Sequence, residues 1–469
     1  MTTVVIIGGG PGGYEAALVA RQLGGEVTLV ERDGLGGAAV LTDVVPSKTL
    51  ITAAEVMTEL RRAGEVGLRL SGGGDLAAAV QVDLGRVNQR ILTLAQDQSR
   101  DIRERLVAEG VRIIDGTGRL NGTSEVLATS DAGQEALPAD IILVATGASP
   151  RELPTARPDG ERIFTWKQLY RLDRLPEHLV VVGSGVTGAE FASAYRTLGA
   201  EVTLVSSRNQ VLPGEDADAA ALIQTVFEAS GMTVLSNARA AGAVRRGDEV
   251  VVSLTDGREV VGSHCLLAVG AVPNTAGLDL AQAGVVVGPS GHIGVDKVSR
   301  TSARGVYAAG DCTGVFALAS VAAMQGRIAM WHALGDAVTP LDLETVAANV
   351  FTAPEIATVG ASEQDVSEGR TPGLVMKLPL RSNARAKMRA VTDGFVKVIC
   401  LPLTGIVIGG VVVGPAASEL IHPLSAAVRN KLTVDQLAAS FTVYPSLSGS
   451  LAEAARRLHG HRSDEAITY

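Results

Sequence analysis

The chain begins, after three residues, with Val4-Val5-Ile6-Ile7-Gly8-Gly9-Gly10-Pro11-Gly12-Gly13. Four consecutive apolar residues indicate a buried strand, and the glycines after them indicate a tight turn into a helix. Apolar residues then recur at helical spacing from Tyr14 to Leu23, and a second strand-like run, Glu26–Glu31, ends on an acid. This order of strand, glycine turn, helix and strand predicts a Rossmann-like dinucleotide-binding fold.

The same pattern returns in the middle of the chain. The apolar run Leu179–Val182 leads into Gly183-Ser184-Gly185-Val186-Thr187-Gly188, and a helical pattern and the strand-like run Glu201–Val205 follow. Glycines at these positions allow a tight turn, a close approach of a pyrophosphate and close packing of helix against strand. The unpaired N–H groups at the helix start favour phosphate binding. The residues predicted to bind phosphates are Gly8, Gly10, Pro11, Gly12, Gly13, Gly183, Gly185, Val186, Thr187 and Gly188.

The two copies differ at the end of their second strand. The first copy has Glu31, which can accept hydrogen bonds from ribose hydroxyls, followed by Arg32, and both are predicted to bind the cofactor. The second copy has Ser206-Ser207-Arg208 at the corresponding place. Because an acid would repel a 2′-phosphate that serine and arginine can bind, we expect NADPH, or both NADPH and NADH, at the second site. Gly188 favours NADH instead, and Arg208 is also compatible with a plain surface position.

Composition narrows the class of protein. Of the 469 residues 46% are apolar, so the chain is not disordered throughout, and its length suggests about three domains. The 41 basic and 50 acidic residues give a net charge of −9 without a long basic run, which argues against nucleic-acid binding. No apolar run approaches the roughly 18 residues of a membrane span, and no secretory signal is visible. We therefore expect a cytoplasmic protein.

The rest of the chain supplies further elements. The predicted helices and short strands outside the glycine units cover 49–70, 83–109, 111–144 and 233–270. From about residue 343, runs such as Phe395–Cys400 indicate an antiparallel sheet in a third domain. The three cysteines, Cys265, Cys312 and Cys400, stand too far apart in the sequence to indicate a zinc cluster or a local redox disulfide. Cys265 and Cys400 lie in apolar runs and are expected in the core.

Four more motifs occur in order: Ala145-Thr146-Gly147, Gly270-Ala271-Val272-Pro273-Asn274-Thr275, Val306-Tyr307-Ala308-Ala309-Gly310-Asp311 and Val350-Phe351-Thr352-Ala353-Pro354-Glu355. With the glycine loops, they resemble the pyridine nucleotide–disulfide oxidoreductase family, which includes lipoamide dehydrogenase and glutathione reductase. The resemblance implies an α/β chain with two Rossmann-like dinucleotide-binding domains and a C-terminal α+β dimerisation domain. It also implies a homodimer with one FAD per subunit.

The resemblance also implies domain boundaries and cofactor residues. The FAD domain would comprise 1–150 and 271–342, the NAD(P)H domain 151–270 and the dimerisation domain 343–469. In the family the aspartate at position 311 binds the ribityl chain, and the position of Cys312 is an ordinary core position. The cofactor-binding residues implied in this way are Gly37, Ala38, Lys48, Ala145, Thr146, Gly147, Glu190, Gly270, Gly310, Asp311, Leu318, Ala319 and Ser320.

The chain departs from the family where the family carries its thiols. The redox disulfide of the family stands in G-G-x-C-x-x-x-x-C-x-P-S-K, and the matching segment 36–48 has Ala39 and Val44 at the cysteine positions. The catalytic base of the family stands in a C-terminal H-P-x-x-x-E, where this chain has Tyr444 and Gly449. Because neither alanine nor valine can provide a thiolate, we expect no reduction of disulfides.

The flavin end of the family's site is retained. In the family, the lysine at position 48 lies against flavin N5 and pairs with the glutamate at position 190, and its charge favours the anionic reduced flavin. Ser320 and Gln325 replace charged residues of a family motif, which either lowers the charge near the flavin or is neutral drift. Lys48, Glu190 and Tyr444 are therefore the predicted catalytic residues. Tyr444 is a candidate proton donor from the partner subunit, with packing as its alternative role.

Without thiols, the electron path ends at FAD, and the acceptor must meet the flavin itself. A planar quinone fits an apolar site of this kind. We therefore predict an FAD-dependent NAD(P)H:quinone oxidoreductase with ping-pong kinetics, closest to the thiol-less NAD(P)H:quinone reductases of the family. The alternatives are a soluble transhydrogenase between NADPH and NAD⁺, and a flavin-binding regulatory protein without turnover.

Overall fold

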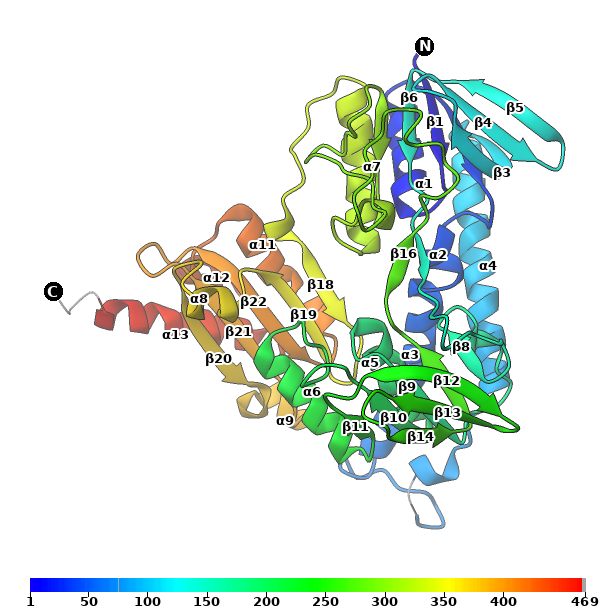
Figure 1. Cartoon of the computed structure of the whole chain (residues 1–469). Helices are drawn as coiled ribbons and strands as arrows, with labels where there is room; N and C mark the ends of the chain where they lie inside the picture. Colours follow the sequence, from blue (N-terminus) through cyan, green and yellow to red (C-terminus); the bar gives the residue numbers. More distant parts are fainter. Residues whose placement is uncertain (75, 466–469) are drawn as a thin grey trace.

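Figure 1 shows three lobes: an N-terminal lobe at the upper right, a second lobe below it and a C-terminal lobe on the left. The structure is a computed structural model, and it describes residues 1–74 and 76–465. The last four residues of the predicted dimerisation domain, 466–469, therefore lie outside the described residues. The order of the lobes along the chain places both glycine loops in the two lobes on the right.

The first lobe contains a seven-stranded sheet. Its strands, in spatial order, are β17 (Val306–Ala308), β6 (Ile141–Val144), β1 (Thr3–Ile7), β2 (Glu26–Glu31), β3 (Arg112–Leu120), β4 (Glu125–Ser130) and β5 (Gly133–Pro138). The pairs from β17 to β3 are parallel, and β3, β4 and β5 are antiparallel. Strand β17 joins this sheet although it follows the second unit in the sequence.

Helices cover this sheet and lead toward the second lobe. They are α1 (Pro11–Gln22), α2 (Gly37–Leu41), α3 (Val44–Arg62), α4 (Leu84–Ala108) and α7 (Ala319–Ala333), with the 3₁₀ turns η1 (Ala77–Ala79) and η3 (Asp311–Thr313). Helices α1 and α7 pack closely because each has a glycine where they touch. A Cβ at Gly326 of α7 would lie 2.0 Å from the carbonyl oxygen of Gly12 of α1. The predicted helix 49–70 is too long at its C-terminal end, since α3 ends at Arg62. Gly67, with a φ of +87°, lies in the turn beyond it.

The second lobe contains a five-stranded parallel sheet. Its strands, in spatial order, are β11 (Thr233–Leu235), β10 (Glu201–Val205), β9 (His178–Val182), β15 (His264–Leu267) and β8 (Ile163–Thr165). The remaining elements are β12 (Ala240–Arg246), β13 (Glu249–Leu254), β14 (Glu259–Gly262), α5 (Val186–Leu198), α6 (Ala217–Ala229) and η2 (Leu169–Arg171). A two-stranded ribbon of β7 (Ala148–Pro150) and β16 (Ala271–Pro273) connects the first two lobes (Figure 1).

The C-terminal lobe contains an antiparallel sheet. Its strands, in spatial order, are β18 (Ala347–Val350), β19 (Glu355–Gly360), β22 (Val407–Gly414), β21 (Phe395–Cys400) and β20 (Leu374–Pro379). Its helices are η4 (Leu343–Thr345), α8 (Glu363–Ser367), η5 (Leu380–Ser382), α9 (Ala384–Met388), α10 (Ala417–Leu420), α11 (His422–Asn430), α12 (Val434–Ala439) and α13 (Gly449–Glu465). The three sheets confirm the predicted α/β fold with two Rossmann-like domains and a C-terminal α+β domain.

One buried apolar cluster connects the lobes. It includes Leu50 and Met57 of α3, Phe191 of α5, and Val350 and Phe395 of the C-terminal sheet. Helix α3 therefore packs against the second lobe rather than against its own sheet alone, and this contact sets the position of its first turn relative to α5. No helix in the described part of the chain combines the length and the apolar character that a membrane crossing requires.

Candidate active site

An ion pair joins the first turns of two helices from different lobes. The Nζ atom of Lys48 on α3 lies 2.8 Å from Oε2 of Glu190 on α5, which confirms the predicted pairing. The other carboxylate oxygen, Oε1, accepts a hydrogen bond of 2.9 Å from the backbone N–H of Phe351. The Phe351 ring centroid lies 4.9 Å from Nζ of Lys48. Phe351, whose role the sequence did not reveal, therefore adds the C-terminal lobe to this pair.

The first glycine loop has an open side at the start of α1. Gly10 is the N-cap of this helix, no side chain caps it, and a Cβ at Gly10 would meet no atom within 4 Å. Gly37 approaches from the other side, because a Cβ there would lie 2.9 Å from Cα of Gly10. Uncapped N–H groups beside a backbone without side chains form a suitable cradle for a pyrophosphate.

Glu31 holds this loop in place. Its Oε2 accepts a hydrogen bond of 2.5 Å from the N–H of Gly9, and its Oε1 accepts one of 2.6 Å from the N–H of Asp33. Oε1 also accepts a bond of 3.3 Å from the N–H of Gly34, so that three of the roughly four acceptor sites of the carboxylate are used and one, on Oε2, is left for a ribose hydroxyl. Arg32 instead pairs with Asp33 on the surface, at 2.9 Å.

The second loop repeats the arrangement of the first. Gly183 has a φ of +110°, and a Cβ there would lie 2.2 Å from the carbonyl oxygen of Ala268. Gly185 is the N-cap of α5 without a side-chain cap, and a Cβ at this position would again meet no atom within 4 Å. Val186, Thr187 and Gly188 form the first turn of α5. This loop therefore offers a second phosphate cradle.

Ser206 is turned away from the surface. Its hydroxyl is fully buried, accepts a hydrogen bond of 2.7 Å from the Ser184 hydroxyl and accepts one of 3.1 Å from the N–H of Arg208. The side chains of Ser207 and Arg208 are exposed. Ser206 thus ties the strand end to the glycine loop, and a contact with a 2′-phosphate is left to Ser207 and Arg208.

The predicted flavin residues around Asp311 lie on a tight turn. Gly310 has a φ of +82°, and its N–H donates a hydrogen bond of 2.9 Å to Oε1 of Gln325. Gln325 is buried, and its Nε2 lies 3.4 Å from the hydroxyl of Thr313 in the same turn. Burial raises the pKa of Asp311. Gln325 therefore supports the turn that carries Asp311, a role that the sequence did not reveal.

The other predicted cofactor residues flank these loops. Thr146 donates a hydrogen bond of 2.7 Å from its hydroxyl to the carbonyl of Asn274, and Nδ2 of Asn274 donates one of 2.9 Å to the carbonyl of Thr146. This exchange ties the segment Ala145–Gly147 to the segment that follows Gly270. The start of α7 has no side-chain cap and comprises Leu318, Ala319 and Ser320.

The two positions that match the redox cysteines of the family carry small apolar side chains in this chain. Ala39 lies in α2, and Val44, which is 37% exposed, is the first residue of α3. The three cysteines are buried, as predicted. The Cys312 thiol donates to the carbonyl of Ala309 at 3.3 Å, and burial raises its pKa to about 11. None of the three cysteines is therefore placed for thiolate chemistry.

Asp43 is a further polar residue of this region, and the sequence did not reveal it. It immediately precedes α3 between the positions of Ala39 and Lys48. Burial raises the pKa of its carboxyl from 3.8 to about 6. The hydroxyl of its neighbour Thr42 is buried without a hydrogen-bond partner among the described residues.

Tyr444 lies on an apolar segment that is exposed in a single chain. Its side chain is 86% exposed, and Phe441 and Val443 beside it are also exposed. An exposed apolar segment of this kind is typical of a surface that contacts another protein. The segment lies in the C-terminal lobe, before α13.

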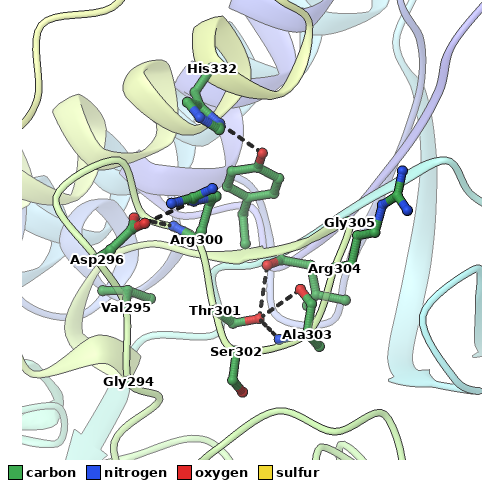
Figure 2. Close-up of a pocket in the computed structure, with 12 residues that line it drawn as sticks. Gly294, Val295, Asp296, Arg300, Thr301, Ser302, Ala303, Arg304, Gly305 and His332 are labelled. Atoms are coloured by element: carbon green, nitrogen blue, oxygen red, sulfur yellow. Dashed lines mark hydrogen bonds and ion pairs between the residues drawn. The ribbon is translucent and has the colours of Figure 1, made fainter.

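A cavity of about 690 Å³ lies elsewhere in the first lobe (Figure 2). Segments 294–296 and 300–307 line it together with His332. Nδ1 of His332 lies 2.9 Å from the hydroxyl of Tyr307, and Arg300 pairs with Asp296 at 2.8 Å. Because none of the predicted site residues lines this cavity, it is separate from the candidate active site. In the described residues, no three His, Cys, Asp or Glu side chains gather in a way that could hold a metal ion.

The geometry fits two dinucleotides. Two uncapped helix starts, each beside open space at a glycine, provide the two phosphate cradles. The orphaned hydroxyl of Thr42 and the partly buried carboxyl of Asp311 are polar groups that a bound flavin could satisfy. The pair of Lys48 and Glu190 lies at the junction of the two lobes that carry these cradles.

Comparison with known proteins agrees with this geometry. The profile of the pyridine nucleotide-disulphide oxidoreductase family matches residues 2–326, and the profile of its dimerisation domain matches 346–455. A Mycobacterium tuberculosis protein named NAD(P)H dehydrogenase (quinone) is 54% identical over 471 residues, which cover 98% of this chain and 94% of the relative. The dihydrolipoyl dehydrogenase of Bacillus subtilis is 32% identical over 454 residues, covering 96% of this chain and 97% of the relative.

Solved structures give the same result. The crystal structure of LpdA from Mycobacterium tuberculosis has a TM-score of 0.93 at 53% identity and covers 98% of this chain and 100% of its own. The HOCl-induced flavoprotein disulfide reductase RclA from Escherichia coli has a TM-score of 0.85 at 25% identity, with coverages of 97% and 99%. The chain belongs to the pyridine nucleotide-disulphide oxidoreductase family.

Proposed function

We propose that this chain is an FAD-dependent NAD(P)H:quinone oxidoreductase that does not reduce disulfides. The observation that carries this proposal is that Ala39 and Val44 occupy the two thiol positions of a chain that keeps the ion pair of Lys48 and Glu190. The charged group that assists flavin reduction is kept, whereas the side chains that would pass electrons to a disulfide are apolar. The name of the Mycobacterium tuberculosis relative, NAD(P)H dehydrogenase (quinone), supports the same activity.

FAD, when bound, accepts a hydride from NAD(P)H and delivers two electrons to the acceptor. The first glycine loop and Glu31 bind its pyrophosphate and ribose, and Asp311 holds the ribityl chain. Lys48 places a positive charge where negative charge develops during reduction. Glu190 fixes the ammonium group of Lys48, because its second oxygen is itself fixed by the N–H of Phe351.

The second glycine loop binds NADPH and NADH. Gly183, Gly185 and the first turn of α5 receive the pyrophosphate. Arg208 is exposed shortly after the end of β10 and offers a guanidinium to a 2′-phosphate, and the described residues 206–210 include no acid that would select against that group. Use of both nucleotides, with a preference for NADPH, follows from this arrangement.

The acceptor is a quinone, and the functional unit is a homodimer. A quinone can stack against a flavin, and the small apolar side chains of Ala39 and Val44 leave an apolar face for it. The exposed segment that contains Phe441, Val443 and Tyr444 provides apolar surface for the second subunit. From that surface, Tyr444 would approach the partner's site.

Steady-state oxidation of NADPH and NADH with a panel of quinones tests this proposal, with lipoamide and thio-NAD⁺ as controls. We expect turnover with quinones, none with lipoamide, and slow hydride exchange with thio-NAD⁺ at most. Fast reduction of thio-NAD⁺ without quinone turnover would instead identify a transhydrogenase. Full FAD occupancy without turnover of any acceptor would leave a flavin-binding regulatory protein.

A further inference from the structure

Asp43 has a rigid backbone and an unpartnered carboxylate. Its N–H donates a hydrogen bond of 2.8 Å to the carbonyl of Ala38, and its carbonyl accepts one of 2.8 Å from the N–H of Ser47. Although it occupies the N-cap of α3, its side chain does not cap the helix. Within the part of the chain that the structure describes, its carboxylate takes part in no hydrogen bond or ion pair. A partly buried carboxyl in this state is available for a ligand or a proton.

Charged groups from four elements face this carboxyl. Lys48 of α3 favours its ionised form, as does Lys167, which precedes η2. Glu190 of α5 and Asp311 of η3 favour the protonated form. Burial is the largest influence, and the pKa of Asp43 rises to about 6 as a result. The carboxyl can therefore both hold and release a proton near neutral pH.

A buried hydroxyl lies close to the same group. The Tyr170 hydroxyl of η2 has no hydrogen-bond partner among the described residues. The pKa of Tyr170 is raised well above its ordinary value, first by burial and then by the charge of Asp43. Tyr170 therefore remains a neutral O–H group in the second lobe and does not compete as an acid.

The carboxyl of Glu190, by contrast, is committed elsewhere. Both oxygens of Glu190 are engaged, one by Lys48 and one by the N–H of Phe351. Asp43 is partly accessible, and the next residue, Val44, is 37% exposed. Asp43 thus directly precedes, in the chain, an accessible side chain at one of the two thiol positions, where the proposed function places the acceptor.

We propose that Asp43 is the proton donor to the reduced quinone, an inference that rests on the proposed quinone reductase activity. The O–H bond of the Asp43 carboxyl breaks and a new O–H bond forms at a quinone oxygen. The hydride that the quinone also receives originates in NAD(P)H and reaches it through FAD. The remaining carboxylate takes a proton from solvent, so that NAD(P)H, one proton and quinone give NAD(P)⁺ and quinol.

The test compares Asp43→Asn with Asp97→Asn, a surface change on α4, in the FAD-loaded protein. Removal of a general acid should lower quinone turnover about 100-fold. Wild-type turnover should fall as the pH rises through about 6, and Asp43→Asn should lose this dependence. Ferricyanide accepts electrons without a proton, so its reduction by Asp43→Asn should stay within twofold of wild type. Asp43→Glu should restore part of the quinone activity.

An infrared titration provides a readout that does not depend on turnover. The FAD-loaded wild type should show a carboxyl C=O band that disappears as the pH rises through about 6, and Asp43→Asn should lack this band. An equal loss of ferricyanide and quinone reduction would overturn the inference, because it would indicate a structural role. Unchanged quinone turnover with an unchanged pH profile would overturn it as well. A wild type that reduces ferricyanide but no quinone would instead refute the proposed function.

Discussion

The Nζ atom of Lys48 lies 2.8 Å from Oε2 of Glu190. This contact joins α3 of the first lobe to α5, the helix that follows the second glycine loop. The glutamate side chain is only 4% exposed, whereas the lysine side chain keeps 27% of its surface. The pair therefore holds one partly accessible ammonium group at the junction of the two lobes that carry the glycine loops.

Replacing Lys48 by Met should slow flavin reduction by NADPH about 100- to 1,000-fold, because a preorganised charge opposite the developing negative charge is lost. Anaerobic stopped-flow measurement of flavin absorbance gives this rate. The matched control is Lys297→Met, an exposed lysine of the first lobe. Equal rates in the two variants would remove Lys48 from the reductive step.

Glu190→Gln should lower the free energy of unfolding by about 1–3 kcal/mol, the usual range for a hydrogen bond to a charged group. The loss stays below that of a fully buried pair because Lys48 can be hydrated, and glutamine can still accept from the N–H of Phe351. Urea unfolding of the FAD-loaded protein measures the change, with Glu201→Gln, at the exposed first residue of β10, as the control. No difference between the two variants would contradict this prediction.

Arg208→Ala should reduce kcat/KM for NADPH about 10- to 100-fold, since one charge-assisted contact with the 2′-phosphate is lost. The value for NADH should not change. Arg239→Ala, an exposed arginine of the same lobe, should alter neither. An unchanged ratio of the two kcat/KM values would show that Arg208 is a plain surface residue.

Lys397 of β21, whose side chain is fully buried, pairs with three carboxylates between the second and C-terminal lobes, of which Asp216 is buried and Asp218 and Glu363 are 40% and 45% exposed. Its ammonium group donates to Asp216 at 2.7 Å, to Asp218 at 2.9 Å and to Glu363. Because Lys397→Met leaves these carboxylates without their buried partner, it should lower the free energy of unfolding by about 3–5 kcal/mol. Lys377→Met removes a half-exposed partner of Asp218 and should cost less than about 1 kcal/mol.

The same cluster predicts a dependence on pH. Burial alone would raise the pKa of Asp218, but hydrogen bonds from Lys397 and Lys377 bring it below its ordinary value of 3.8. Its contribution to stability is therefore present above about pH 4 and is lost as the pH falls through the lowered pKa. Urea unfolding between about pH 6 and pH 3 should show a smaller loss of stability for Lys397→Met than for wild type. An identical slope would contradict the assignment.

Local patterns in the sequence predict much of this fold because strands, glycine turns and helix starts are determined by neighbouring residues. The segments Val4–Gly13 and Leu179–Gly188 show this, as does the motif-based pairing of Lys48 with Glu190. The extension of the helix beyond Arg62 was wrong because the turn that ends α3 depends on glycine conformation rather than on apolar spacing.

Contacts between residues far apart in the sequence leave a weaker signal. Lys397 meets Asp216 across 181 residues, and its only local sign is a lysine inside an apolar strand. Asp43 is likewise visible in the sequence only as an acid in a largely apolar stretch. Most of the charges that act on its carboxyl belong to residues far away in the sequence. Ser206 also needed the structure, because sequence position alone does not show that its hydroxyl is turned inward.

Direct transfer of electrons from FAD to quinone is the central claim, and anaerobic stopped-flow spectroscopy tests it most directly. One equivalent of NADPH should reduce all of the bound FAD, since no redox disulfide is present to take a second pair of electrons. One equivalent of a benzoquinone should then restore the oxidised flavin spectrum at a rate no slower than steady-state turnover. Uptake of a second equivalent of NADPH, or reoxidation slower than turnover, would contradict direct transfer.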